Sequence, residues 1–204
     1  MKKTNILLLS LLLIPFSESN ALDKTVFTSN NPINDIKILQ QDTTSWINNF
    51  RQFRTAIYQA DKTKVKSFIN FPIMNENNEI WYLIYPEDDK LTDKIKPFTK
   101  KDFDKYFGKL FTKEFKNCIQ KIKTQQLYTT GHFETIELSD GKGTTYKMYA
   151  TVDKKEMTLS LNLAFNILKS NNEEAADVQE SNILYYFKIK KNGELKFIQV
   201  RLAG

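Results

Sequence analysis

Apolar positions near the start of the chain repeat with the period of an α-helix. Successive spacings of four, three and four residues put four of them on one face, ending near Ala60. Asn31-Pro32 is an earlier helix-start signal, so residues 33–60 form either one helix or two. In the second case Thr43 or Thr44 caps the later helix. The four apolar residues are Trp46, Phe50, Phe53 and Ile57.

Three further segments follow before the pattern changes. Asp61 is placed to cap a short helix that carries Val65, Phe68 and Ile69. Glu79–Tyr85 is rich in aromatic and branched residues, which predicts a strand. Thr99-Lys100-Lys101-Asp102 resembles a capping box and opens a long helix that bends at Thr112. Its apolar stripe is Phe103, Phe107, Leu110 and Phe111.

In the C-terminal half the period changes from 3.6 to 2, which indicates strands joined as an antiparallel meander. The clearest alternation is in Met157–Ile167, and Asn192-Gly193 is a strong hairpin signal. Ser139–Gly143 and Asp153–Glu156 are predicted turns, and Ser170–Ser181 a polar loop. The predicted strands are Leu127–Leu138, Tyr146–Val152, Met157–Ile167, Asn182–Lys190 and Glu194–Leu202.

Helices gathered before a run of strands predict an α+β fold in which the helices cover one face of the sheet. With 15 phenylalanines and nine tyrosines to place, we expect the interior to be filled by rings, without a converging polar cluster. The predicted core is Trp46, Phe50, Phe53, Ile57, Phe103, Phe107, Leu110, Leu159, Leu161, Leu163, Phe165 and Phe187.

Over residues 43–202 this order of elements resembles the nuclear-transport-factor-two-like superfamily, the cystatin-like cone. Phe68-Ile69-Asn70-Phe71-Pro72-Ile73 and Lys101-Asp102-Phe103-Asp104-Lys105-Tyr106-Phe107 are similar to stretches found there. The resemblance implies a strongly curved, mainly antiparallel sheet wrapped around the N-terminal helices as a cone. It implies no single function, because isomerases, dehydratases and non-catalytic binding modules share the fold.

Residues 1–21 have the pattern of a cleaved signal peptide. Lys2 and Lys3 precede an apolar run from Ile6 to Phe16, and small residues at Ser19 and Ala21 fit cleavage after Ala21. The run is shorter than the roughly 20 residues of a spanning helix. We therefore expect a periplasmic or secreted protein, with no membrane segment after cleavage. Residues 22–42 then form an N-terminal arm or the start of the first helix, and 43–204 a single domain.

The net charge and the basic residue types limit the classes of partner that the protein is expected to bind, and the cysteine content limits its thiol chemistry. The chain has a net charge of +6, and removal of 1–21 lowers this by one. Lysine supplies most of the basic side chains, and only three are arginine, the usual reader of phosphate and bases. We expect an acidic protein partner or a small ligand, and no nucleic acid. Cys118, the single cysteine, lies in an apolar helical stretch and is predicted to be a buried, inert thiol.

Candidate chemistry is sparse. His132 is the single histidine and shares a predicted strand face with Glu134, an arrangement that would suit the acid/base pair of an isomerase or dehydratase. The sequence predicts no metal site and no cofactor, because one histidine and one cysteine far apart do not form a zinc site. The acidic run at Glu173-Glu174 lacks the ligand pattern of a calcium loop.

Arg51, Arg54 and Tyr58 lie on one helical stripe beside the apolar face. The two arginines are placed either to pair with carboxylates at the sheet edge or to hold an anionic ligand or partner. We thus expect an exported non-catalytic binding module. The alternatives are a periplasmic immunity-type protein that binds a toxin and an isomerase- or dehydratase-like enzyme that uses His132 and Glu134.

Overall fold

Six helices and a six-stranded antiparallel sheet make up the part of the chain that the structure describes. The structure is a computed structural model, and it describes residues 45–75, 77–86, 96–169 and 177–204. The predicted signal peptide and the arm at 22–42 lie outside these ranges. So does the start of 33–60, and with it the choice between one helix and two.

The sheet is an open meander with the order β1-β3-β4-β5-β6, and β2 pairs with β3 beside β1. Each strand from β3 to β6 pairs with the next along the chain, as the sequence predicts. Alternate residues of β4 face the helices, so Leu159, Leu161 and Leu163 are fully buried. The strands are β1 His132–Glu134, β2 Leu138–Ser139, β3 Thr144–Asp153, β4 Thr158–Lys169, β5 Asp177–Ile189 and β6 Leu195–Ala203.

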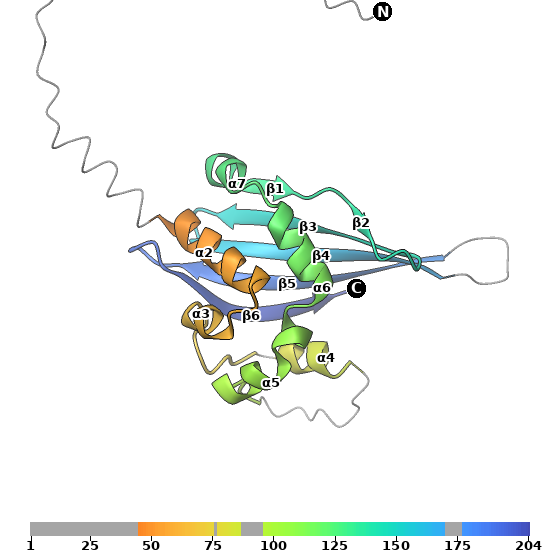
Figure 1. The fold of residues 1–204 in the computed structure, drawn as a ribbon, viewed down its shortest axis with the longest axis horizontal. Coiled ribbons are helices and arrows are strands. Elements are labelled where there is room, and N and C mark those ends of the chain that lie inside the picture. Colours follow the sequence, from red (N-terminus) through yellow and green to blue (C-terminus); the bar gives the residue numbers. More distant parts are fainter. Residues whose placement is uncertain (1–44, 76, 87–95, 170–176) are drawn as a thin grey trace, which may run out of the picture.

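The helices cover one face and both edges of this sheet. Figure 1 shows α2 and α6 lying across the face, α3 to α5 beside β6, and α7 next to β1. This arrangement confirms the predicted α+β class. The helices are α2 Trp46–Tyr58, α3 Lys62–Ser67, α4 Glu79–Ile84, α5 Lys100–Leu110, α6 Lys113–Lys121 and α7 Thr124–Thr130. Within the described ranges, none of them is long and apolar enough to cross a bilayer.

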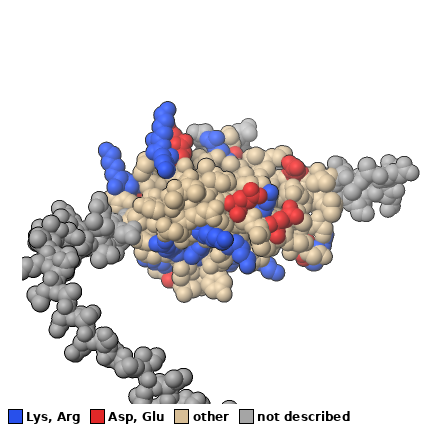
Figure 2. Space-filling model, turned by 90° about the horizontal axis from the view of Figure 1, so that it is seen from above, with Lys and Arg blue, Asp and Glu red and all other residues tan. Residues whose placement is uncertain are grey.

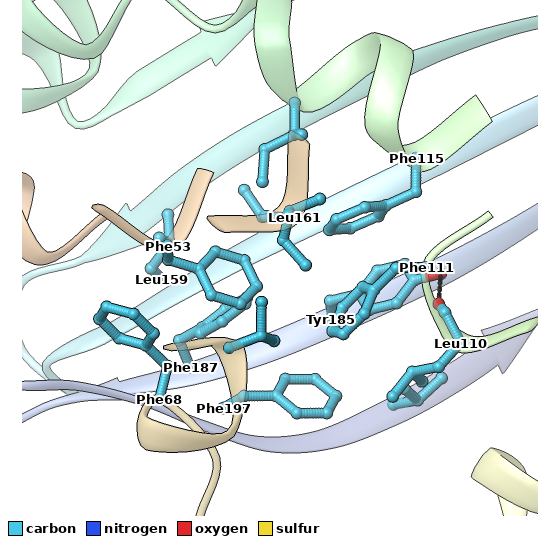
Figure 3. Close-up of a cluster of buried hydrophobic side chains, with 14 of the residues drawn as sticks. Phe53, Phe68, Leu110, Phe111, Phe115, Leu159, Leu161, Tyr185, Phe187 and Phe197 are labelled. Carbon is cyan, nitrogen blue, oxygen red and sulfur yellow. Dashed lines mark hydrogen bonds between the residues drawn. The ribbon is translucent and has the colours of Figure 1, made fainter. Parts of the chain in front are cut away.

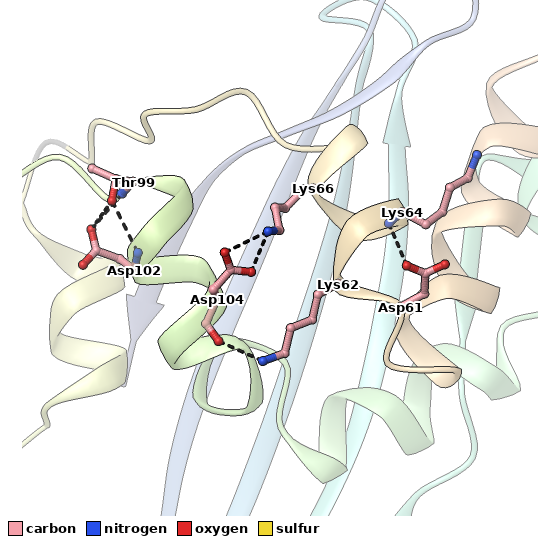
Figure 4. A network of polar contacts seen from close by, with 7 residues as sticks. All are labelled: Asp61, Lys62, Lys64, Lys66, Thr99, Asp102 and Asp104. Atoms are coloured by element: carbon pink, nitrogen blue, oxygen red, sulfur yellow. Dashed lines mark hydrogen bonds and ion pairs between the residues drawn. The ribbon is translucent and has the colours of Figure 1, made fainter.

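Side-chain caps fix the ends of α3 and α5, as the sequence predicts (Figure 4). Asp61 Oδ1 accepts the Lys64 N–H at 2.9 Å. Thr99 and Asp102 form a reciprocal capping box, in which each side chain accepts the other's backbone N–H. The two helices are then joined because Lys66 pairs with Asp104 at 2.6 Å and Lys62 donates to the Asp104 carbonyl. Thr112 caps α6 at the predicted bend.

Aromatic rings fill the space between the helices and the sheet (Figure 3). Phe111 is fully buried and its ring lies 5.1 Å from that of Phe115 and 6.0 Å from that of Tyr185. Phe53 packs edge-on against Phe187 at 5.1 Å. The predicted core residues are all buried except Trp46 and Phe165, which are partly buried.

The outer edge of β6 is covered by neighbours that satisfy its backbone. Phe197 N–H donates to the Phe68 carbonyl, and the Asn70 N–H donates to the Phe197 carbonyl. Further along, the Asn75 side chain bonds both the N–H and the carbonyl of Val200, and Glu79 Oε1 accepts the Leu202 N–H. Side chains thus continue the ladder that a further strand would provide.

The prediction of a strand at Glu79–Tyr85 is wrong, because these residues form α4. The buried residues are Ile80, Trp81 and Ile84, which is helical spacing. Asn78 adopts a left-handed conformation that turns the chain into the helix, and its Oδ1 accepts the Lys96 N–H. Packing of Trp81 against α5 and the 96–98 segment outweighs the local strand preference.

Two other boundaries differ from prediction. Leu127–Leu138 is not one strand: α7 runs to Thr130 and ends at Gly131, whose φ of 76° suits the left-handed C-cap. Only His132–Glu134 and Leu138–Ser139 then pair with β3. The predicted polar loop Ser170–Ser181 is also too long, because β5 begins at Asp177 and pairs with β4 from Lys169 onward. Residues 170–176 lie outside the described ranges.

Candidate functional site

The interior offers no converging polar group among the described side chains. Tyr185 is fully buried, and its hydroxyl donates to the Leu110 carbonyl at 3.0 Å. Burial raises the pKa of Tyr185 well above its usual value, so this hydroxyl is held neutral. Two hollows, of about 680 and 550 Å³, lie instead at the surface of the described structure.

His132 and Glu134 lie on the exposed face of β1, on either side of buried Phe133. Each has its own partner on β3. Glu134 Oε1 pairs with Lys147 Nζ at 2.7 Å, and His132 Nδ1 lies 3.3 Å from Thr151 Oγ1. The Glu134 carboxylate and the Tyr149 hydroxyl raise the pKa of Lys147. The structure thus gives Glu134 a lysine partner and places His132 beside a hydroxyl.

Arg51 and Arg54 bond to neutral groups of the helical layer, and neither forms an ion pair with a carboxylate of the described residues. The alternative role, holding an anionic ligand or partner, stays a prediction. Arg51 donates to Thr124 Oγ1 at 3.1 Å and to Asn48 Oδ1 at 2.6 Å. Arg54 donates to the Ile122 carbonyl at 2.7 Å. Burial and, after it, the charge of Arg51 lower the pKa of Arg54. The two guanidinium groups therefore join α2 to the α6–α7 corner. Tyr58, at the end of α2, is 70% exposed.

Tyr58 borders a groove that the sequence did not single out. The groove has a volume of about 680 Å³ and lies between α6 and the β2–β3 hairpin. This volume is within the range of about 300–1,000 Å³ that ligand sites occupy. One wall is a stripe of α6 beside its buried face, which the sequence marks by spacings of three, one, three and one residues. The stripe is Lys113, Lys116, Asn117, Gln120 and Lys121.

The lining of this groove is basic. No aspartate or glutamate lies among its described lining residues. Lys113, Lys116 and Lys121 take part in none of the ion pairs that the described residues form. Figure 2, seen from the side of β1, shows a band of basic side chains, and further basic side chains beside the acidic ones and at another edge.

The nearest acidic side chains in the sequence have other roles. The carboxylate of Asp140 accepts the backbone N–H groups of Lys142 and Thr144 at 2.7 and 3.1 Å, within the hairpin turn. Those two bonds help to lower the pKa of Asp140. Glu114, on α6, is half-buried, and its charge helps to raise the pKa of Cys118 and the pKa of Tyr185. Glu137 is exposed next to Leu138.

The opposite wall and the floor are aromatic and polar. Tyr146 of β3 is buried, and its hydroxyl accepts a hydrogen bond from Asn117 Nδ2 at 3.0 Å. Phe111 forms part of the floor. The Gln120 side chain donates to the Arg54 carbonyl at 3.0 Å, which fixes its orientation. Lys116 Nζ lies over the ring of Phe107, 5.3 Å from its centroid. The groove therefore combines ammonium groups that have no carboxylate partner among the described residues with fixed amides and aromatic rings.

Cys118 is fully buried on the other side of α6, as predicted. Burial raises the pKa of its thiol to about 11, although a hydrogen bond from Thr135 acts in the opposite direction. No group of three or more side chains able to ligate a metal occurs within the ranges that the structure describes.

No protein-family model matches the chain, and neither a curated protein nor a solved structure matches it. The resemblance to the nuclear-transport-factor-two-like superfamily stays a prediction, with which the architecture of helices on an open antiparallel sheet agrees.

Proposed function

We propose that this chain is an exported, non-catalytic binding module that acts on another protein through its surface. The observation that carries the proposal is the filled interior. The rings of Phe111, Phe115 and Tyr185 pack against one another in the space between the helices and the sheet, with centroids 5.1 and 4.4 Å apart for the Phe111–Phe115 and Phe115–Tyr185 pairs. The hollows described above lie instead at the surface, and this supports recognition through the surface.

Export supports this role and is tested separately. The predicted signal peptide implies a mature chain that begins at Leu22. Expression of the full chain in a Gram-negative host, followed by fractionation and mass measurement, should yield a processed product outside the cytoplasm. Ala21→Asp should block processing, because the cleavage site requires a small residue. A full-length product in the cytoplasm would contradict the export part of the proposal.

The binding role is tested on the purified mature chain. We expect it to form a stoichiometric complex with one protein from the extracytoplasmic fraction of its own organism, identified by mass spectrometry and re-formed from purified components. An immunity-type protein is the special case in which this partner is a toxin. Tyr185→Phe, which changes the interior only, should leave the complex intact.

The enzyme hypothesis gives the opposite result. It requires turnover of a small substrate by the mature chain and loss of that turnover in both His132→Ala and Glu134→Gln. The geometry favours it less, because Glu134 is paired with Lys147 and both side chains are exposed. Such turnover, with no protein partner recovered, would overturn the proposal.

A further inference from the structure

We infer that the groove between α6 and the β2–β3 hairpin is the docking site for an extended acidic segment of the partner protein. The inference rests on the proposed function and specifies where and what the module binds. It starts from Lys113, Lys116 and Lys121, which line one wall of the groove and have no carboxylate partner among the described residues.

The spacing of these lysines selects the shape of the occupant. Lys113 and Lys121 are separated by eight residues of helix, or about 12 Å along its axis. A single phosphate or carboxylate is too small to contact both ends of such a row. An extended polypeptide advances about 3.3 Å per residue, so a segment of about four residues spans it. A chain with several carboxylates therefore fits the row better than a small anion.

The remaining lining suits a polypeptide rather than a nucleic acid. The amide nitrogens of Asn117 and Gln120 donate to the Tyr146 hydroxyl and the Arg54 carbonyl, which holds both side chains in place. Fixed side-chain amides match the N–H groups of a peptide backbone. The groove has no arginine in its lining, and arginine is the usual bidentate partner of phosphate.

Aromatic side chains supply the apolar part of the site. Tyr58 is 70% exposed at the rim, where its ring is open to stacking by an incoming side chain. Tyr and Trp are enriched where interfaces concentrate their binding energy. The best peptide for the groove therefore alternates acidic with aromatic residues, so that carboxylates meet the α6 lysines and a ring meets Tyr58.

The test uses a fluorescein-labelled peptide, (Glu-Tyr)₃, titrated with the mature protein and followed by fluorescence anisotropy. Exposed ion pairs each contribute about 0.2–1 kcal/mol, so the triple variant Lys113→Gln/Lys116→Gln/Lys121→Gln should bind about tenfold more weakly. Tyr58→Ser should bind a few-fold more weakly. A rise in salt should reduce the difference between wild type and the triple variant.

A matched control separates the groove from net charge. Lys101→Gln/Lys155→Gln/Lys191→Gln removes the same charge from exposed positions outside the groove, and it should bind the peptide within about twofold of wild type. Equal weakening by the two triple variants would overturn the assignment. So would tighter binding of an oligonucleotide such as (dT)₁₂, or of (Gln-Tyr)₃. Circular dichroism and thermal melting verify that every variant is folded.

The partner complex distinguishes failure of this inference from failure of the proposed function. If the isolated partner binds wild type and the groove variant equally, the groove assignment is wrong and the binding-module proposal stands. If neither a partner nor the acidic peptide binds, both are wrong. If the groove variant loses binding to both the partner and the acidic peptide, while the control variant keeps both, the groove assignment and the binding-module proposal are both supported.

Discussion

The side-chain amide of Asn75 bonds both backbone groups of Val200, 125 residues further along the chain. Its Nδ2 donates to the Val200 carbonyl at 2.5 Å, and its Oδ1 accepts the Val200 N–H at 3.3 Å. Asn75 is 1% exposed, so water does not replace these bonds. One side chain thus stands in for a peptide unit at the open edge of the sheet.

We expect Asn75→Ala to lower the free energy of unfolding by about 2–4 kcal/mol, because each buried group left without a partner costs about 1–3 kcal/mol. Urea denaturation followed by circular dichroism measures the loss. Asn70→Ala is the matched control, because the Asn70 side chain is exposed and only its backbone N–H contacts β6. A loss below about 1 kcal/mol in Asn75→Ala would show that the edge is not stabilised in this way.

Tyr185→Phe should lower the free energy of unfolding by about 1–3 kcal/mol. The change keeps the ring in the core and removes only the bond to the buried Leu110 carbonyl. Tyr186→Phe is the control one residue along the strand, where the side chain faces the other side of the sheet and is half-exposed. Urea denaturation compares the two, and equal effects would contradict the role given to the Tyr185 hydroxyl.

Cys118 predicts a dependence of stability on pH. Burial raises the pKa of its thiol from 9.0 to about 11, so between these values the unfolded chain loses the proton and the folded chain keeps it. Stability from this residue is present below pH 9 and is lost as pH rises toward 11. The difference in unfolding free energy between wild type and Cys118→Ala, measured from pH 8 to 11, gives the pH-dependent contribution of the Cys118 thiol.

The Cys118 thiol of the native protein should not react with the thiol reagent dithionitrobenzoate at pH 8. In 6 M guanidinium chloride, which unfolds the chain, the same thiol should react at once. Fast reaction of the native chain would show that Cys118 is accessible and would remove the basis for the pH prediction.

The capping box should contribute more than the ion pair shown beside it in Figure 4. Thr99→Ala removes the N-cap of α5 and should cost about 1 kcal/mol in unfolding free energy. Lys66→Ala breaks the pair with Asp104, in which the Asp104 side chain is 49% exposed, and should cost about 0.5 kcal/mol. Thermal melts in low and high salt measure both. A larger, salt-dependent loss in Lys66→Ala would reverse this order.

The sequence predicted the elements whose pattern is set by nearest neighbours. The meander follows from strict alternation in β4 and from the Asn192-Gly193 turn, and the α3 and α5 starts follow from Asp61 and Thr99. At Thr112 the sequence predicted a bend in one long helix, where the structure has two helices, α5 and α6. These signals depend on residues close together in the sequence, so they can be recognised without knowledge of the fold. The packed core follows from them, because the apolar stripes of the helices meet the apolar face of the sheet.

The errors lie where distant contacts decide. Glu79–Ile84 has strand-forming residues but forms a helix because Trp81 packs between Phe98 and Tyr106. The groove was missed for a related reason. Its α6 wall has a visible spacing of lysines, yet only the fold brings Tyr58 and the β2–β3 hairpin to face it. Of the two roles predicted for Arg51 and Arg54, pairing with carboxylates is not seen among the described residues, where a hydroxyl, an amide and a carbonyl accept their hydrogen bonds.

The order of elements also determines when the fold can be completed. Every described helix precedes the sheet in sequence, and Leu195–Ala203 is the last of the described strands. A chain that emerges N-terminus first therefore presents the apolar faces of α2, α5 and α6 long before the strands that cover them. Phe197 and Val200, which form hydrogen bonds with Phe68 and Asn75, are synthesised after all of the described helices. Until the strands are free to pair, these apolar faces stay exposed, and a partly synthesised chain of this kind is prone to aggregate unless it is shielded.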